Sequence, residues 1–327
     1  MKAVVGDIFN DDDLAQARRL NRLLSFLPRY QTGRRWNARL VQGVLTVAQL
    51  VVPDVRRLRR RVSVIEIPDL STRIRVVRPD TVPQAMLVHF HGGAWVLGNA
   101  RLEDRLAASM ARECGLVVAV VEFRNAIDDD LASTVQECSA VTEWLADNLQ
   151  RFGVQDLFLS GESSGAHLAV EALLHLRSVG KHDNVLGFYS VCGGFDLTGS
   201  PSLRANSRRS LLIDDRSALA NLARLTLSLP ADRARGPLHA DLHDLPPALF
   251  IAASLDPILD DSIEMSAKWQ KENGNAESLI VPEAPHGFNR FPTSLAAKTN
   301  RFGRDWMNNV LSQRKTERAG NVGAKPM

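Results

Sequence analysis

The sequence predicts an α/β protein in which helices cover both faces of a mostly parallel, doubly wound sheet, with a helical cap added to this core. From about residue 60 onward, short apolar runs alternate with longer segments of helical periodicity. The 327 residues are 45% hydrophobic and 24% charged, values that are ordinary for a globular chain with a sizeable core. This composition excludes collagen-like, coiled-coil and intrinsically disordered proteins.

Six short apolar runs are the candidates for buried strands. They occupy residues 85–90, 116–123, 156–160, 185–191, 248–254 and 278–282. Helical periodicity lies between them, at residues 102–114, 131–150, 165–179 and 258–273. This alternating order favours parallel strands joined by helical crossovers.

Two regions do not fit the alternation. Residues 1–60 are expected to form a helical cap segment, and residues 203–237, rich in Arg, Leu and Ala, an inserted cap segment. The catalytic core is then expected at 61–202 and 238–312. Open α/β sheets bind ligands beyond the carboxyl ends of their strands, where both cap segments are expected to act as a lid. The polar tail 313–327 is expected to be disordered.

The charge is small overall but uneven along the chain. The net charge is +3, and the tightest basic run is Arg56, Arg57, Leu58, Arg59, Arg60 and Arg61. Such runs are usually solvated faces or partners of acidic neighbours. A nucleic-acid or anionic-membrane patch is the less favoured alternative, because no nucleic-acid motif accompanies the run, and we expect no nucleic-acid partner.

The cysteines and the hydropathy pattern indicate the cellular compartment in which the protein is expected to lie. Cys114, Cys138 and Cys192 are odd in number and far apart, which argues against a disulfide framework and a structural zinc site. No segment reaches the length of apolar sequence that a membrane span needs. Acidic residues at 11–13 stand where a signal peptide would be apolar. We therefore expect a cytoplasmic protein.

The strongest motif stands at a predicted strand-to-helix turn. Residues 161–165, Gly-Glu-Ser-Ser-Gly, match the pattern G-x-S-x-G directly after the strand candidate at 156–160. A sharp turn there holds Ser163 in a strained conformation, and side chains at positions 161 and 165 would collide with neighbouring elements. Ser163 is therefore the predicted nucleophile, and a small-residue turn without chemistry is the alternative.

A second motif, His-Gly-Gly-Ala-Trp at 91–95, follows the strand candidate at 85–90. Consecutive glycines allow backbone N–H groups to point at an oxygen that becomes negative in a tetrahedral intermediate. The N–H of Ser164, at the start of the next helix, adds a donor at the favourable end of the helix dipole. The predicted oxyanion hole consists of Gly92, Gly93 and Ser164.

A nucleophilic serine needs a base, and the base needs an orienting carboxylate. His286 lies in a turn just past the last strand candidate and is the predicted base. Asp256 follows the run at 248–254 and precedes a proline that favours a loop, so it is the predicted carboxylate. Asp260 and Asp261 are less favoured, because one turn into a helix they more plausibly cap it.

The remaining histidines and the aromatic residues give weaker signals. His239 and His243 have the spacing of a metal site, but their proline-flanked loop shows no evident further ligand, so we expect no metal and no organic cofactor. Four aromatic residues adjoin the motifs and are candidates either to line an apolar substrate pocket or to be ordinary core: Trp95, Phe123, Phe195 and Phe288.

These motifs, in this order, resemble the hormone-sensitive-lipase-like branch of the α/β-hydrolases, the bacterial family IV esterases. The resemblance runs from about residue 65 to 312, through HGGAW at 91–95, GESSGAHLA at 161–169, FDLTGSPS at 195–202, ADLHDLPPALF at 240–250, DPILDDS at 256–262 and APHGF at 284–288. It implies the α/β-hydrolase fold, the triad Ser163, Asp256 and His286, oxyanion donors at Gly92, Gly93 and Ser164, and a cap built from the N-terminal helices and the inserted segment.

The chain also departs from the family pattern. Residues 123–128, Phe-Arg-Asn-Ala-Ile-Asp, stand where the family has Tyr-Arg-Leu-Ala-Pro-Glu, so this loop is expected to be reshaped. Ala94 replaces the third glycine of the usual HGGG, although the first two glycines remain. The HGGAW segment is also similar to the oxyanion loop of arylformamidases, which implies an amidase-type alternative.

The expected function is hydrolysis of a small carboxylic ester with a short to medium acyl chain, through an acyl-enzyme on Ser163. The alternative is the same triad acting on a formamide, amide, lactone or carbamate, because leaving-group selectivity resides in the pocket and lid. A non-catalytic small-ligand receptor on this fold is least favoured, since no triad residue is missing. A homodimer through an outer strand or the lid is left open.

Overall fold

A computed structural model describes residues 8–31, 33–51, 62–128, 130–205 and 211–323. Its centre is an eight-stranded sheet in the order β1-β2-β4-β3-β5-β6-β7-β8. The strands are β1 (Val62–Ile67), β2 (Thr72–Val77), β3 (Ala85–Phe90), β4 (Leu116–Glu122), β5 (Leu157–Glu162), β6 (Val185–Val191), β7 (Ala248–Ala253) and β8 (Ala276–Val281). Strands β3 to β8 run parallel, whereas β2 is antiparallel to both β1 and β4. The predicted doubly wound, mostly parallel sheet is confirmed.

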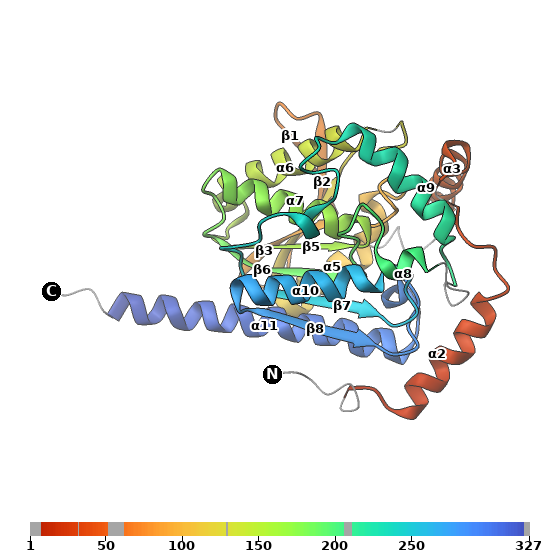
Figure 1. Ribbon diagram of the computed structural model, residues 1–327. Helices are drawn as coiled ribbons and strands as arrows, with labels where there is room; N and C mark the ends of the chain where they lie inside the picture. The colour runs from red at the N-terminus through yellow and green to blue at the C-terminus, as the bar shows by residue number, and fades with distance from the viewer. Residues whose placement is uncertain (1–7, 32, 52–61, 129, 206–210, 324–327) are drawn as a thin grey trace.

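Five longer helices cover the two faces of this sheet (Figure 1). Buried residues of α6 (Leu131–Asp147), α7 (Ser164–Ser178) and α10 (Leu259–Asn273) form one hydrophobic core with the sheet. Buried residues of α5 (Asp104–Cys114) and α11 (Ser294–Gly323) form the other. Because helices cover both faces, the central strands are buried on both sides and read as continuous apolar runs.

The first two strands were not among the predicted ones. In β1, buried and exposed positions are mixed, because the strand lies at the edge of the sheet. β2 alternates the exposed Arg73 and the half-buried Arg75 with the buried aliphatic side chains of Ile74 and Val76. Antiparallel strands near an edge carry one solvated face, so neither strand shows the continuous apolar run by which the other six were found.

The cap elements lie at the end of the sheet to which the parallel strands point (Figure 1). These are α2 (Asp11–Leu24), α3 (Arg35–Val51), α8 (Pro201–Arg204) and α9 (Asp215–Leu225). Tyr30, between α2 and α3, forms a β-bridge with Ile213, which precedes α9. The Tyr30 N–H donates to the Leu212 carbonyl at 2.8 Å, and the Asp214 N–H donates to the Tyr30 carbonyl at 3.1 Å. Two segments far apart in the sequence are thus joined over the carboxyl edge.

The C-terminal segment corrects one prediction. Residues 313–327 were expected to be disordered, but α11 continues as a helix to Gly323. Arg314 and Arg318 donate hydrogen bonds to the buried Asp156 carboxylate at 3.3 and 3.0 Å, and Lys315 donates to Gln84 Oε1 at 2.7 Å. These contacts anchor the polar end of the helix to the sheet layer.

Residues 324–327 lie outside the described residues, as does the basic run at 56–61. Within the described part of the chain, no helix has the length and apolar character needed to cross a membrane.

Candidate active site

The turn between β5 and α7 holds Ser163 in an unusual backbone conformation, with φ 53° and ψ −122°. A side chain is rarely found at such a positive φ unless the surrounding structure imposes it. The two glycines of the motif permit the turn. A Cβ at Gly161 would lie 2.3 Å from the Gly165 carbonyl oxygen, and a Cβ at Gly165 would lie 2.1 Å from the Phe90 carbonyl oxygen. The glycines therefore let strand, turn and helix approach closely enough to present Ser163 at the sheet edge.

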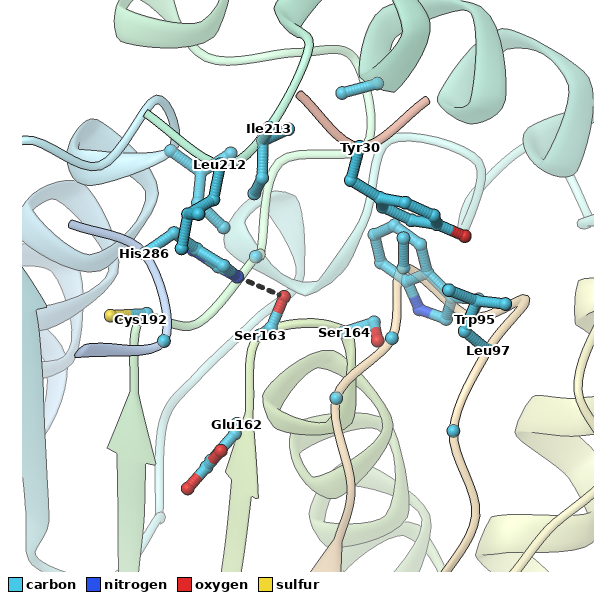
Figure 2. Close-up of a pocket in the computed structure, with 18 of the residues that line it drawn as sticks. Tyr30, Trp95, Leu97, Glu162, Ser163, Ser164, Cys192, Leu212, Ile213 and His286 are labelled. Carbon is cyan, nitrogen blue, oxygen red and sulfur yellow. Dashed lines mark hydrogen bonds between the residues drawn. The ribbon is translucent and has the colours of Figure 1, made fainter. Parts of the chain in front are cut away.

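The three predicted triad residues come together at this edge. His286 Nε2 lies 2.9 Å from Ser163 Oγ (Figure 2). His286 Nδ1 lies 2.8 Å from Asp256 Oδ2. The other Asp256 oxygen accepts the Ile258 N–H at 3.0 Å. Because a carboxylate only accepts, the Nδ1 proton points at Asp256 and Nε2 is left to accept the serine proton. The turns after β5, β7 and β8 supply the three side chains, since parallel strands end at one edge.

The electrostatics of His286 suit a base. Burial by itself lowers the pKa of this imidazole, but the Asp256 carboxylate beside it, with smaller contributions from Glu162 and Asp261, raises the pKa above its ordinary 6.5. Asp256 is the largest of these favourable partners, because it is close and hydrogen-bonded. A raised pKa makes the imidazole a stronger proton acceptor for the serine hydroxyl.

The alternative carboxylates serve other groups. Asp260 accepts the N–H of Ser202 at 2.8 Å, so it caps the short helix α8. Asp261 Oδ2 accepts two backbone N–H groups, from Phe195 at 2.6 Å and Asp196 at 2.8 Å. Burial raises the pKa of Asp261 to about 7. The carboxylate that accepts the His286 Nδ1–H hydrogen bond is Asp256.

The predicted oxyanion donors Gly92, Gly93 and Ser164 line the same cavity as Ser163. Gly93 has φ 139°, and a Cβ there would lie 2.1 Å from the Leu97 carbonyl oxygen. Ala94 and Trp95 follow it with φ of 52° and 64°. Three consecutive residues of positive φ fold the loop back over the elbow. Position 93 requires glycine, because a side chain there would be strained and would collide with Leu97.

Neighbouring residues hold this loop in place. The ring of His91 stacks on Phe123 at a centroid distance of 4.1 Å, and its Nδ1–H donates to the Gly92 carbonyl at 2.9 Å. Burial lowers the pKa of His91 to about 4, so the ring is neutral near pH 7. The Ala126 N–H donates to the Trp95 carbonyl at 2.7 Å. The loop at 123–128 that departs from the family pattern therefore packs against the oxyanion loop.

A cavity of about 460 Å³ opens beside the triad. Figure 2 shows Ser163 and His286 facing each other, with Tyr30, Leu212 and Ile213 from the cap above them and Trp95 to one side. Trp95 is the one predicted pocket residue that lines the cavity. Phe123, Phe195 and Phe288 are buried in the core and are absent from its lining, so the prediction that they form the pocket is wrong. Their motifs face the site, but their rings point into the hydrophobic layers.

Sequence reasoning missed most of the apolar wall. It is formed by Tyr30, Leu45, Leu97, Leu102, Leu203, Leu212, Ile213, Leu222 and Ile258. Most of these residues lie in cap segments, where the sequence has helical periodicity but no motif to mark which side chains face the site.

The histidines considered for a metal site point to different partners. His239 Nε2 lies 3.3 Å from Asp196 Oδ1, whereas His243 Nδ1 lies 2.7 Å from Asp241 Oδ1 and 3.8 Å from Glu272. Asp241 and Glu272 were not foreseen as neighbours of His243. The two histidines do not share a carboxylate in these pairs, so the spacing in sequence does not bring them to one site.

Comparisons with known proteins agree with this geometry. A family model described as alpha/beta hydrolase fold matches residues 87–290. An acetyl esterase of Salmonella paratyphi B is 26% identical over 252 residues, covering 72% of this chain and 75% of that protein. A solved esterase of Pyrobaculum calidifontis is 25% identical, with a TM-score of 0.73 over 91% of this chain and 98% of that one. A solved esterase of the bacterial hormone-sensitive lipase family is 20% identical, with a TM-score of 0.72 over 93% and 99% of the two chains. The chain therefore belongs to the α/β-hydrolase family, and its resemblance to the hormone-sensitive-lipase-like branch is confirmed.

Proposed function

We propose that this protein hydrolyses small carboxylic esters with a short to medium acyl chain, using Ser163 as nucleophile, His286 as base and Asp256 as the orienting carboxylate. The observation that carries the proposal is the hydrogen-bonded chain from Ser163 through His286 to Asp256, with distances of 2.9 and 2.8 Å, at the wall of a largely apolar cavity. Relatives that are named esterases in both comparisons support an ester as the substrate.

In the proposed mechanism, His286 Nε2 accepts the hydroxyl proton of Ser163 as its oxygen attacks the ester carbonyl carbon. The carbonyl oxygen becomes negative and is held by the N–H groups of Gly92, Gly93 and Ser164. When the tetrahedral intermediate collapses, His286 gives its proton to the departing alcohol, and Ser163 keeps the acyl group. A water molecule, deprotonated by His286, then attacks the acyl carbon; acid is released and Ser163 regains its proton.

The size of the cavity supports the proposed substrate range. A volume of about 460 Å³ lies at the lower end of the range for small-molecule sites. Its wall combines aliphatic side chains with the ring of Trp95. Such a wall stabilises apolar acyl or alcohol groups by removing them from water.

We also propose a cytoplasmic location, which is supported by three cysteines that are free and buried. The homodimer stays a prediction.

Hydrolysis of p-nitrophenyl esters from acetate to laurate tests the proposal, with the wild-type protein and a Ser163→Ala variant compared. The wild type is expected to turn over the short esters, and the variant to lose activity while its circular dichroism spectrum stays unchanged. The acyl length with the highest kcat/KM then measures the pocket. A folded wild-type protein without activity on any ester would contradict the proposal, and formamides, amides, lactones and carbamates would be the next substrates.

A further inference from the structure

A cluster of charged side chains lies directly beneath the nucleophile elbow. Arg290 Nε donates to Glu162 Oε2 at 2.7 Å, and Arg290 Nη2 donates to Glu103 Oε1 at 2.5 Å. Asn289 Nδ2 donates to the other Glu162 oxygen at 2.6 Å. The side chain of Glu103 is 1% exposed and that of Glu162 is 9% exposed, whereas that of Arg290 is 40% exposed. Two carboxylates are therefore buried around one guanidinium that reaches solvent.

The three charged residues belong to three different parts of the site. Glu162 directly precedes Ser163, and Arg290 stands four residues after His286, at the end of a 3-10 turn over Phe288–Arg290. Glu103 ends the short turn Ala100–Glu103, which follows the oxyanion loop. One guanidinium thus connects the nucleophile elbow, the turn that carries the base and the segment after the oxyanion loop.

The turn between His286 and Arg290 is internally hydrogen-bonded. The Phe288 N–H donates to the Pro285 carbonyl at 3.1 Å, and the Arg290 N–H donates to the Gly287 carbonyl at 3.3 Å. Asn300 of α11 donates to the Asn289 carbonyl at 2.9 Å. Because the turn is closed by its own bonds, an anchor at positions 289 and 290 restrains the backbone at 286 as well.

We propose that Arg290 is a positioning residue that holds the base turn against the nucleophile elbow through Glu162 and Glu103, and that the Glu162 carboxylate stabilises the His286 imidazolium during catalysis. The proposal rests on the catalytic roles given to Ser163 and His286 above. Figure 2 shows Glu162 below Ser163, on the side of the elbow away from Tyr30 and the cap. Glu162, Glu103 and Arg290 line the same cavity as Ser163 and His286.

The charges around His286 agree with this role. The groups that face it are Asp256 after β7, Glu162 at the end of β5, Asp261 on α10 and the Cys192 thiol after β6, beside Ser163 itself. Asp256 contributes most, and Glu162 is the next charged group in raising the pKa of His286. Burial alone would raise the pKa of Glu103, but Arg290 holds it well below its usual range, so the carboxylate stays charged.

Two other roles for the cluster fit less well. His89, Glu103 and Glu162 have donor atoms within 4.8 Å of one another, as a metal site would. However, Arg290 is hydrogen-bonded to both carboxylates and supplies the positive charge that a metal would supply. A subsite for an anionic substrate is also disfavoured, because two carboxylates outweigh the one guanidinium. Positioning explains why a buried ionic cluster, costly to form, stands at this point.

Arg290→Lys tests the positioning role, because it keeps the positive charge but loses the planar fork that bonds two carboxylates. We expect kcat to fall by about 10- to 100-fold, the effect of a small misplacement of catalytic groups, with KM changed less than about 2-fold. The matched control is Arg304→Lys, which alters another ion pair, between Arg304 Nε of α11 and Glu113 Oε2 of α5 at 2.6 Å. A kcat for Arg290→Lys equal to that of the control would overturn the proposal.

Glu162→Gln tests the charge separately, since the amide keeps the shape and an acceptor oxygen but not the negative charge. The acidic limb of the kcat/KM profile is expected to move to lower pH by about 0.5 unit or more, because an imidazolium without this carboxylate loses its proton more easily. An unchanged limb would show that Glu162 does not act on His286.

A titration without turnover separates this inference from the proposed function. The imidazole of His286 is followed by NMR in Ser163→Ala, with and without Glu162→Gln. The second substitution is expected to lower the titration midpoint of His286, even if no ester is ever a substrate. An unchanged midpoint would refute the inference, whereas inactivity of the wild type on every ester would refute only the proposed function. The titration tests the charge of Glu162 whether or not Arg290→Lys folds.

Discussion

Replacing Asp256 by Asn tests the central geometry of the site most directly. Asp256 Oδ1 accepts the Ile258 N–H at 3.0 Å, and Oδ2 faces His286 Nδ1 at 2.8 Å. In Asp256→Asn, the amide oxygen is expected to take the bond from Ile258, which turns the NH₂ group toward His286. The imidazole must then accept at Nδ1 and carry its proton on Nε2, facing Ser163. In that tautomer Nε2 has no lone pair for the serine proton.

The expected loss in kcat is about 10,000-fold, as for the same change in a Ser-His-Asp triad of known behaviour. At about 1.36 kcal/mol for each factor of ten, this corresponds to about 5.4 kcal/mol of transition-state stabilisation. The assay is hydrolysis of p-nitrophenyl acetate, with folding checked by circular dichroism. Asp260→Asn is the matched control, because Asp260 bonds Ser202 rather than His286, and it should stay within about 3-fold of wild type. An Asp256→Asn variant that keeps a tenth of wild-type kcat would refute the assigned triad.

Three further predictions follow from other parts of the structure. The kcat/KM of the wild type should fall on acidification with a midpoint above 6.5, because the pKa of His286 is raised and only the neutral imidazole accepts the serine proton; a pH profile with a lower midpoint would contradict this. Gly165→Ala should abolish activity and lower the melting temperature, since its Cβ would lie 2.1 Å from the Phe90 carbonyl oxygen; a wild-type melting curve would count against the steric argument. Trp269→Ala should lower the free energy of unfolding by about 3–5 kcal/mol in urea titrations, because this fully buried ring also donates to a backbone carbonyl; a loss below about 1 kcal/mol would be inconsistent with that packing.

Local sequence was sufficient to predict the central strands and to choose the three residues that the fold brings together as the proposed triad. Strands β3 to β7 are buried on both faces, so continuous apolar runs mark them, whereas β8 lies at the edge of the sheet and has exposed positions. The elbow at 161–165 could be recognised because the close backbone contacts of this turn require glycine at two of five consecutive positions. Asp256 and His286 could be chosen because each follows a recognisable strand, and parallel strands end at a common edge.

Contacts between distant segments could not be predicted in this way. The bridge between Tyr30 and Ile213 joins residues that no periodicity relates, and it decides which cap side chains face the cavity. From its sequence, the C-terminal segment was predicted to be a polar, disordered tail. In the structure it is a helix, and its Arg314 and Arg318 donate hydrogen bonds to the buried Asp156 carboxylate. A run of polar residues by itself predicts a solvent-exposed segment. Only the tertiary structure shows that some of these residues have partners in a distant part of the chain.

The sequence by itself determined the class of fold and which residues are proposed as nucleophile, base and carboxylate, because these depend on backbone sterics and on burial patterns within short windows. Tertiary structure decided the wall of the pocket, the order at the C-terminus and the ionic cluster of Glu103, Glu162 and Arg290. Arg290 and Glu103 are 187 residues apart, and their meeting depends on how whole layers pack. Motifs that depend on local backbone sterics can be recognised in neighbouring residues. The side chains that surround them come from distant parts of the chain and are brought together only by tertiary packing.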